Sequence, residues 1–145
     1  MKDLRKWVPG FLLIAVFAFG MIAPGLQAES VAVGKFKLPF NAQLEKIALP
    51  IGDYTFSIDH LDGTIIVYQG STPLGILRPQ LFDNYQDQGK NPVLICIRHD
   101  GNVTVRALRL PKVGTFYFSL PKELRGLMAR QPKLVETVSV QVTGE

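Results

Sequence analysis

The chain has 145 residues, of which 47% are hydrophobic and 19% are charged, and this balance is typical of a single globular domain rather than a disordered segment. Its formal net charge is +4. Three basic residues and one acidic residue fall within the first 28, so residues 29–145 carry 13 basic and 11 acidic side chains, a net charge of +2. We therefore expect no concentrated basic face and no nucleic-acid partner.

The N-terminal segment has the three parts of a secretory signal peptide. A basic start over residues 2–6 is followed by an apolar run over residues 11–22, and Ala28 supplies the small residue at which cleavage occurs. The apolar run is shorter than the roughly 20 residues that span a bilayer. We expect a bacterial type of signal, cleavage after Ala28, a secreted or periplasmic protein and no membrane span in the processed chain. An uncleaved N-terminal anchor is the alternative.

The rest of the chain, residues 29–145, reads as one β-rich domain. Short runs in which apolar and polar residues alternate are separated by Pro, Gly, Asn and Asp. These are the residues that end and connect short strands. In chain order, strands are expected over 31–38, 44–49, 54–59, 64–69, 73–78, 93–99, 102–110, 114–118 and 134–142. The run from Tyr54 alternates apolar and polar residues, which indicates one buried face. This pattern predicts an all-β, mainly antiparallel fold, either a small β-sandwich or a partly open barrel.

The first hairpin is predicted from Asp62-Gly63, a pair that suits a two-residue turn in which both residues take positive φ. Such a turn would place Ile58 opposite Val67 and would direct both side chains to the core.

Asp100-Gly101 repeats the same turn signal between two apolar runs. A two-residue loop here would place Cys96 opposite Val105 and Leu94 opposite Ala107. Because Cys96 is the only cysteine, the chain cannot form an internal disulfide. We expect its thiol to be a small buried hydrophobe rather than a reactive group.

A short helix is predicted near the C-terminus, over residues 121–130. Ser119 is its expected N-cap, and Pro132 is expected to stop it. Its apolar residues Leu124, Leu127 and Met128 recur at helical spacing, so they should lie on one face.

The longest polar stretch, residues 79–92, joins the two hairpin regions. Long connections of this kind are often functional, so we expect the contact surface of the protein here. The candidate binding residues are two aromatic and two acidic side chains: Phe82, Asp83, Tyr85 and Asp87. Sugar binding by exposed aromatic rings is less favoured, because the only tryptophan, Trp7, precedes the expected cleavage point.

Two short motifs resemble those of a known group of proteins. Phe36-Lys37-Leu38-Pro39-Phe40 is followed by Leu49-Pro50-Ile51-Gly52-Asp53-Tyr54 and then by an aromatic and aliphatic hairpin. This order resembles the "V-P-F-x-F" and "L-P-A-G-x-Y" patterns of small secreted β-rich proteins of acidobacteria, over most of residues 31–120. Leucine and isoleucine replace the usual valine and small residue here. The resemblance implies a secreted β fold and no particular chemistry.

No catalytic or cofactor motif is recognisable, so we expect no cofactor and no enzymatic activity. A metal site is conceivable if the two hairpin tips meet, although two unrelated turns are favoured; it would use His60, Asp62, His99 and Asp100. A small periplasmic hydrolase is a second possibility, with paired carboxylates drawn from Asp59, Asp62, Asp83 and Asp87.

The function best supported by this sequence is an exported, non-enzymatic module that binds an envelope or extracellular ligand. The hydrolase is the first alternative. The second is a subunit that pairs an exposed sheet edge with another chain, because small open sheets leave such edges unpaired.

Overall fold

A computed structural model describes residues 30–59, 63–84 and 90–144 of the chain. In these residues it contains the following strands: β1 Ser30–Leu38, β2 Ala42–Leu44, β3 Ile47–Leu49, β4 Gly52–Asp59, β5 Ile65–Gln69, β6 Thr72–Leu77, β7 Leu81–Asp83, β8 Val93–His99, β9 Asn102–Leu110, β10 Gly114–Tyr117 and β11 Glu136–Thr143. One α-helix, α1 (Lys122–Arg130), and one 3-10 turn, η2 (Pro132–Leu134), precede β11.

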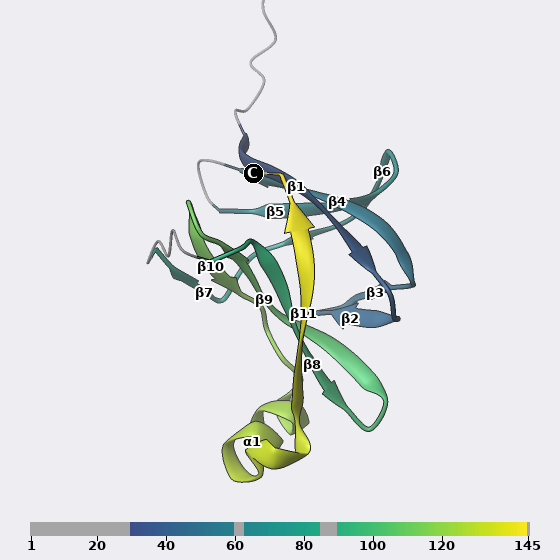
Figure 1. Cartoon of the computed structure of the whole chain (residues 1–145), viewed down its shortest axis with the longest axis vertical. Helices are drawn as coiled ribbons and strands as arrows, with labels where there is room; N and C mark the ends of the chain where they lie inside the picture. Colours follow the sequence, from purple (N-terminus) through teal and green to yellow (C-terminus); the bar gives the residue numbers. More distant parts are fainter. Residues whose placement is uncertain (1–29, 60–62, 85–89, 145) are drawn as a thin grey trace, which may run out of the picture.

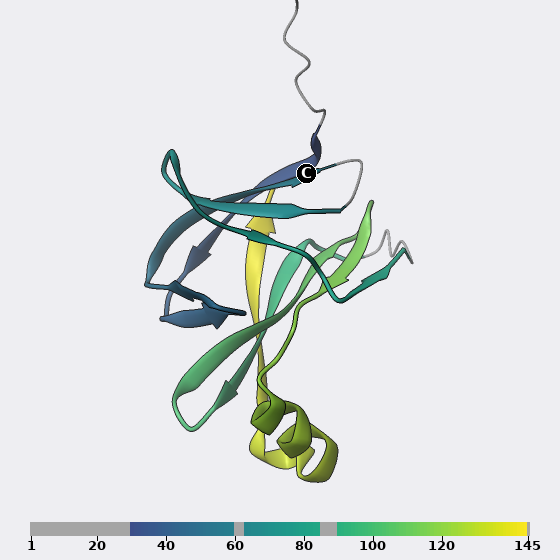
Figure 2. The same cartoon turned by 180° about the vertical axis from the view of Figure 1, so that it is seen from behind.

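The strands form one curled sheet in the order β3-β2-β9-β8-β11-β1-β4-β5-β6, with β10 pairing to both β9 and β7 (Figure 1). Every pairing is antiparallel except that of β2 with β9. The sheet turns a corner at β1, which pairs with β4 along its length but with β11 only at Lys35 and Phe36. Seen from behind, the chain runs from β6 directly into β7 and so returns to the far part of the sheet (Figure 2). The predicted all-β, mainly antiparallel fold with a short C-terminal helix is confirmed, as a partly open barrel.

The barrel stays open between its two outermost strands, β3 and β6, which share no ladder in the described residues. The gap is narrow nonetheless. A Cβ atom added at Gly75 of β6 would lie 2.3 Å from Cδ1 of Ile47, which comes from β3. The gap between β3 and β6 is therefore filled by the side chain of Ile47, which packs on Gly75, and no backbone hydrogen bonds of a ladder bridge it in the described residues.

The core lies inside the barrel and follows the predicted alternation. Tyr54, Phe56 and Ile58 of β4 are all buried. Phe36 of β1 stacks on Tyr54 with ring centroids 5.4 Å apart. A Cβ at Gly34 would lie 2.5 Å from the ring of Phe56, so this part of β1 can pass the ring only as glycine.

The β8–β9 hairpin has the predicted two-residue turn, in which Asp100 and Gly101 have φ of 49° and 76°. Cys96 pairs with Val105 as expected.

Beyond the pair of Cys96 and Val105, the predicted register of this hairpin is wrong. Leu94 pairs with Leu108 rather than Ala107, because a bulge between Ile95 and Cys96 shifts the register by one residue. Past the bulge, Leu108 and Leu110 join the core in place of Ala107. A bulge moves the inward-facing set of side chains by one position, and the residue types alone do not reveal it.

The register predicted for the β4–β5 hairpin is also wrong. Ile58 pairs with Ile65 rather than Val67. The loop is longer than two residues, since the N–H of Asp59 donates to the carbonyl of Thr64 at 2.9 Å. The shift is an even number of residues, so the same side chains still face the core.

Two predicted segments contain more structure than expected. The single strand expected over 44–49 is a tight hairpin of β2 and β3, with Glu45 at φ 52° in its turn. The polar stretch 79–92, expected to be a loop, contains β7, which pairs with β10. In both cases the strands have only three residues, too few to produce a visible alternation. None of the helical segments in the described part of the chain has the length and apolar character needed to cross a bilayer.

Candidate functional site

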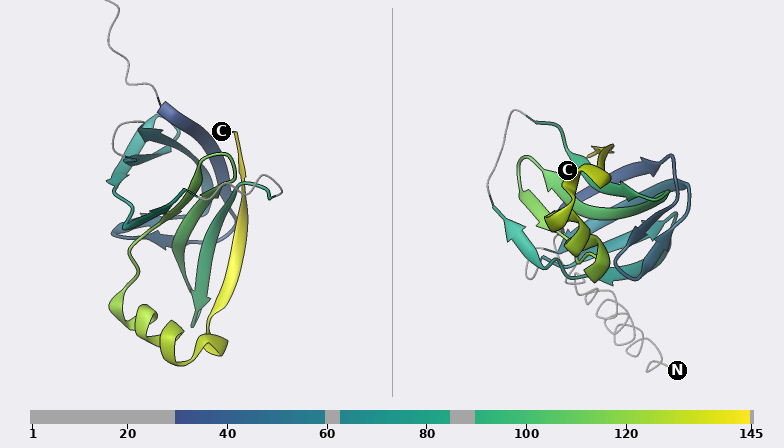
Figure 3. Two further views of the ribbon diagram at one scale, coloured as in Figure 1. Left: turned by 90° about the vertical axis from the view of Figure 1, so that its left-hand side faces the viewer. Right: turned by 90° about the horizontal axis from the view of Figure 1, so that it is seen from below.

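The C-terminal helix α1 begins after Pro121 and lies across one end of the barrel (Figure 3). Glu123 in its first turn and Arg130 in its last both complement the helix dipole. The predicted cap is wrong: no side chain caps the helix, and the backbone N–H of Ser119 instead donates to Oε1 of Glu45 at 3.1 Å. The hydrogen bond ties the segment before the helix to the β2–β3 turn.

Helix α1 is amphipathic, yet none of its residues is buried. Leu124, Leu127 and Met128 are half-buried. The helix packs closely against η2 and makes little contact with the strands. An apolar helix face normally stabilises a fold by covering the core. Here a space remains between that face and the barrel.

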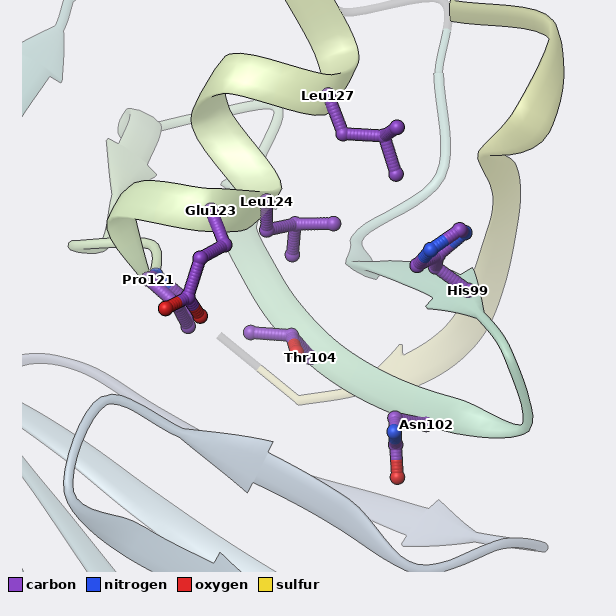
Figure 4. A pocket seen from close by; sticks show the side chains of 7 residues that line it. All are labelled: His99, Asn102, Thr104, Pro121, Glu123, Leu124 and Leu127. Atoms are coloured by element: carbon purple, nitrogen blue, oxygen red, sulfur yellow. The ribbon is translucent and has the colours of Figure 1, made fainter. Parts of the chain in front are cut away.

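A pocket of about 360 Å³ occupies the space between α1 and the β8–β9 hairpin. Leu124 and Leu127 extend from the helix toward the hairpin, which carries His99 and Thr104 (Figure 4). The full lining consists of apolar helix residues and a polar rim: His99, Asn102, Thr104, Pro121, Glu123, Leu124 and Leu127.

Among the residues that the structure describes, Thr104 is the one polar residue that is buried, and it forms part of the pocket wall. In the sheet it pairs with Ile97 of β8 and with Gln43 of β2. Ile97 alternates with the core residue Cys96, so it points to the outer face, where it is nevertheless buried. On the outer face beside α1, the hydroxyl group of Thr104 therefore lies next to the buried Ile97.

His99 fixes one side of the pocket. Its Nδ1–H donates to the carbonyl oxygen of Leu134 at 3.0 Å, which ties η2 to the end of β8. Its Nε2 lies 3.2 Å from Oδ2 of Asp100. The hydrogen bond to Leu134 gives His99 a structural role at the end of β8.

A second hollow, of about 670 Å³, continues from the pocket along the outside of the sheet. The two share Asn102 and Thr104, and the second extends to the β2–β3 hairpin at Gln43 and Ala48. Together they form a groove that runs from α1 across the first half of β9.

The residues predicted to bind lie elsewhere. Phe82 and Asp83 are on β7, and Tyr85 and Asp87 fall outside the described residues. Phe82 is 47% exposed, and its ring stacks on Phe116 with centroids 4.6 Å apart. Leu81 beside it is 60% exposed. β7 thus presents two exposed apolar residues on a paired strand, and neither of them lines the α1 pocket.

Of the residues considered for catalysis or metal binding, the described structure places His99 and Asp100 side by side, with 3.2 Å between Nε2 and Oδ2. Asp59 and Asp83 end separate strands, while His60 and Asp62 fall outside the described residues. Within residues 30–59, 63–84 and 90–144, no group of three His, Cys, Asp or Glu side chains could hold a metal ion. Burial raises the pKa of the Cys96 thiol to about 12, so it is no nucleophile at neutral pH.

Sequence reasoning found the helix and its apolar face but not the pocket. The available signal was the spacing of Leu124, Leu127 and Met128, which alone predicts packing against the barrel. The space between the helix and the barrel depends on how residues 118–121 and η2 position the helix. Comparisons with protein-family models, curated proteins and solved structures found no match to this chain.

Proposed function

We propose that this protein is an exported, non-enzymatic binding module that takes an apolar group of its ligand into the pocket under α1. The observation that carries the proposal is that Leu124 and Leu127 line an open pocket between the helix and the β8–β9 hairpin. Exposed apolar surface gains about 25 cal/mol per Å² when a ligand removes it from water.

The size and lining of the pocket suit a small apolar body with one polar group. Its volume of about 360 Å³ lies at the lower end of the range for ligand pockets, roughly 300–1,000 Å³. Leucine side chains supply one wall, and Thr104 and Asn102 supply hydrogen-bonding groups on the other.

The charge at the rim favours a ligand with a cationic or donor group. Glu123 lines the pocket, and no ion pair engages it within residues 30–59, 63–84 and 90–144. A ligand amine would meet this carboxylate favourably, whereas a ligand carboxylate would be repelled by it.

Two further observations support the absence of catalysis and the export of the protein. The thiol of Cys96 is buried, and Nδ1 of His99 is tied to the carbonyl oxygen of Leu134. Residues 1–28 have the composition of a signal peptide, and the motifs that resemble secreted acidobacterial proteins agree with an extracytoplasmic location.

The test is an NMR titration of the protein with three ligands that share one chain: hexylamine, hexanol and hexanoate. We expect the methyl signals of Leu124, Leu127 and Thr104 to shift, with affinity falling from amine to alcohol to carboxylate. Leu127→Gln should weaken hexylamine binding at least tenfold, which corresponds to about 1.4 kcal/mol. Leu81→Gln makes the same change at an exposed leucine on β7 and should leave affinity unchanged. Equal affinity of Leu127→Gln and the parent would refute the pocket.

A second candidate function follows from β7. In the described residues this strand pairs with β10 alone, and it exposes Leu81 and Phe82. An unpaired edge with apolar side chains is suited to pairing with another chain. If β7 serves in this way, the protein self-associates or binds envelope material, and Leu81→Lys abolishes that association in sedimentation equilibrium. A monomer at all concentrations, with envelope binding unaffected by Phe82→Ser, would exclude this candidate.

A further inference from the structure

The outward side of α1 is cationic. At 3.6 residues per turn, Lys122 lies on the side of the helix opposite Leu124 and Leu127, with Arg125 about 60° to one side of it and Arg130 about 80° to the other. All three basic side chains are exposed. Since the leucines point toward the hairpin (Figure 4), helical geometry places Lys122 on the side away from it and Arg125 and Arg130 on the two flanks.

Positive charge is concentrated in this segment. Residues 122–133 contain four basic residues and one acidic residue, a net charge of +3, because η2 adds the exposed Lys133. Residues 29–145 as a whole carry +2, so everything outside the segment sums to −1. The expectation of no concentrated basic face was therefore wrong. The four basic residues are distributed over α1 and η2, and they do not form a continuous run in the sequence.

We infer that this cationic face of α1, defined as Lys122, Arg125 and Arg130 and followed along the chain by Lys133 of η2, docks the protein on an anionic lipid bilayer. The three charges of α1 are spread along a helix of nine residues, which is about 13 Å long, and none of them lines the α1 pocket. Such a distribution matches an array of headgroups better than a single bound phosphate. Leu134, which is 55% exposed, lies directly beside Lys133 and can enter the headgroup layer.

Other polyanions fit this face less well. Residues 121–134 contain no aromatic side chain, so the segment has no platform on which a nucleic-acid base could stack. The expected export of the chain places it next to lipid rather than next to nucleic acid. None of the four cations lines the α1 pocket, so lipid docking and ligand binding are separable properties.

The experiment measures vesicle binding by the exported form of the protein. Co-sedimentation is compared for vesicles of phosphatidylcholine with phosphatidylglycerol and for vesicles of phosphatidylcholine alone. Each basic residue near an anionic surface contributes roughly a fivefold gain in binding. The triple variant Lys122→Gln, Arg125→Gln, Arg130→Gln should therefore bind the anionic vesicles about a hundredfold more weakly. Glutamine is a good helix former, so α1 should persist, and circular dichroism checks this.

A matched control removes the same charge elsewhere. Lys35→Gln, Lys37→Gln, Lys46→Gln changes three exposed lysines that lie outside α1 and η2. We expect this control to bind anionic vesicles within about threefold of the parent. Equal binding to both kinds of vesicle, or equal losses in the two triple variants, would overturn the inference. Tighter binding to a duplex DNA oligonucleotide or to heparin than to the anionic vesicles would also overturn it. Binding of hexylamine is expected to be unchanged in the α1 triple variant, so the two proposals can fail independently.

Discussion

Replacement of Gly114 by alanine tests how β7 is held against the barrel. Gly114 starts β10 with φ of +141°, a conformation that L residues rarely adopt. A Cβ atom there would lie 2.4 Å from the carbonyl oxygen of Asp83 and 2.7 Å from the ring of Phe82. Because the nearest atom belongs to the backbone of β7, the overlap cannot be relieved by rotating a side chain. The strand itself has to move.

The expected loss of stability has two parts. Holding a non-glycine residue at such a φ costs about 1–3 kcal/mol. Displacing β7 also breaks the stack of Phe82 on Phe116, which is worth about 0.5–1.5 kcal/mol. We therefore expect Gly114→Ala to lower the free energy of unfolding by about 3 kcal/mol.

Gly70→Ala separates the two parts. Gly70 also has positive φ, 62°, but a Cβ atom there would meet nothing within 4 Å. This variant should lose only the conformational part, about 1 kcal/mol. The measurement is urea unfolding of the parent and both variants, followed by far-UV circular dichroism. If Gly114→Ala and Gly70→Ala lose the same stability within about 0.5 kcal/mol, the close contact of β7 with Gly114 does not exist.

Three further predictions concern the core thiol and the α1 region. Burial raises the pKa of Cys96 from 9.0 to about 12, so the thiol ionises first in the unfolded chain as pH rises, and stability should fall between pH 9 and 12. In urea titrations at several pH values, Cys96→Ala should reduce this fall in the free energy of unfolding by up to about 4 kcal/mol. The same dependence of the free energy on pH in the variant and the parent would contradict the prediction. His99→Ala removes the hydrogen bond to Leu134 and should speed amide exchange in η2 by about fivefold, with global stability nearly unchanged. Gly126→Ala adds a Cβ atom in open space on α1 and should slow amide exchange there by about fivefold; faster exchange would show that the helix is more closely packed than described.

The fold class could be predicted because its signals are local. Alternation from Tyr54 to Ile58 marks a strand with one buried face, and the pair Asp100-Gly101 supplies the positive φ angles of a tight turn. Both depend on residues within a few positions of one another, so no knowledge of the rest of the chain is needed. The strands that were not predicted as separate elements, β2, β3 and β7, are each too short for such a pattern.

The candidate site could not be predicted in the same way. The stretch that contains Phe82 and Asp83 stood out by its length and polarity, yet these two residues lie on a paired strand. The α1 pocket brings together residues of β8, β9 and the helix, which are separated by some twenty positions in the chain. Leu124 and Leu127 were recognised only as one side of an amphipathic helix.

The order of residue types by itself determined that this chain forms short antiparallel strands around an apolar interior, because side chains alternate across a strand whatever the strand pairs with. It also determined that a short amphipathic helix follows the barrel strands. Only the tertiary structure decided where the register slips, which side of the barrel stays open, and that the apolar face of α1 meets a pocket while its cations face outward. These features depend on distances between segments far apart in the chain, and close packing sets those distances.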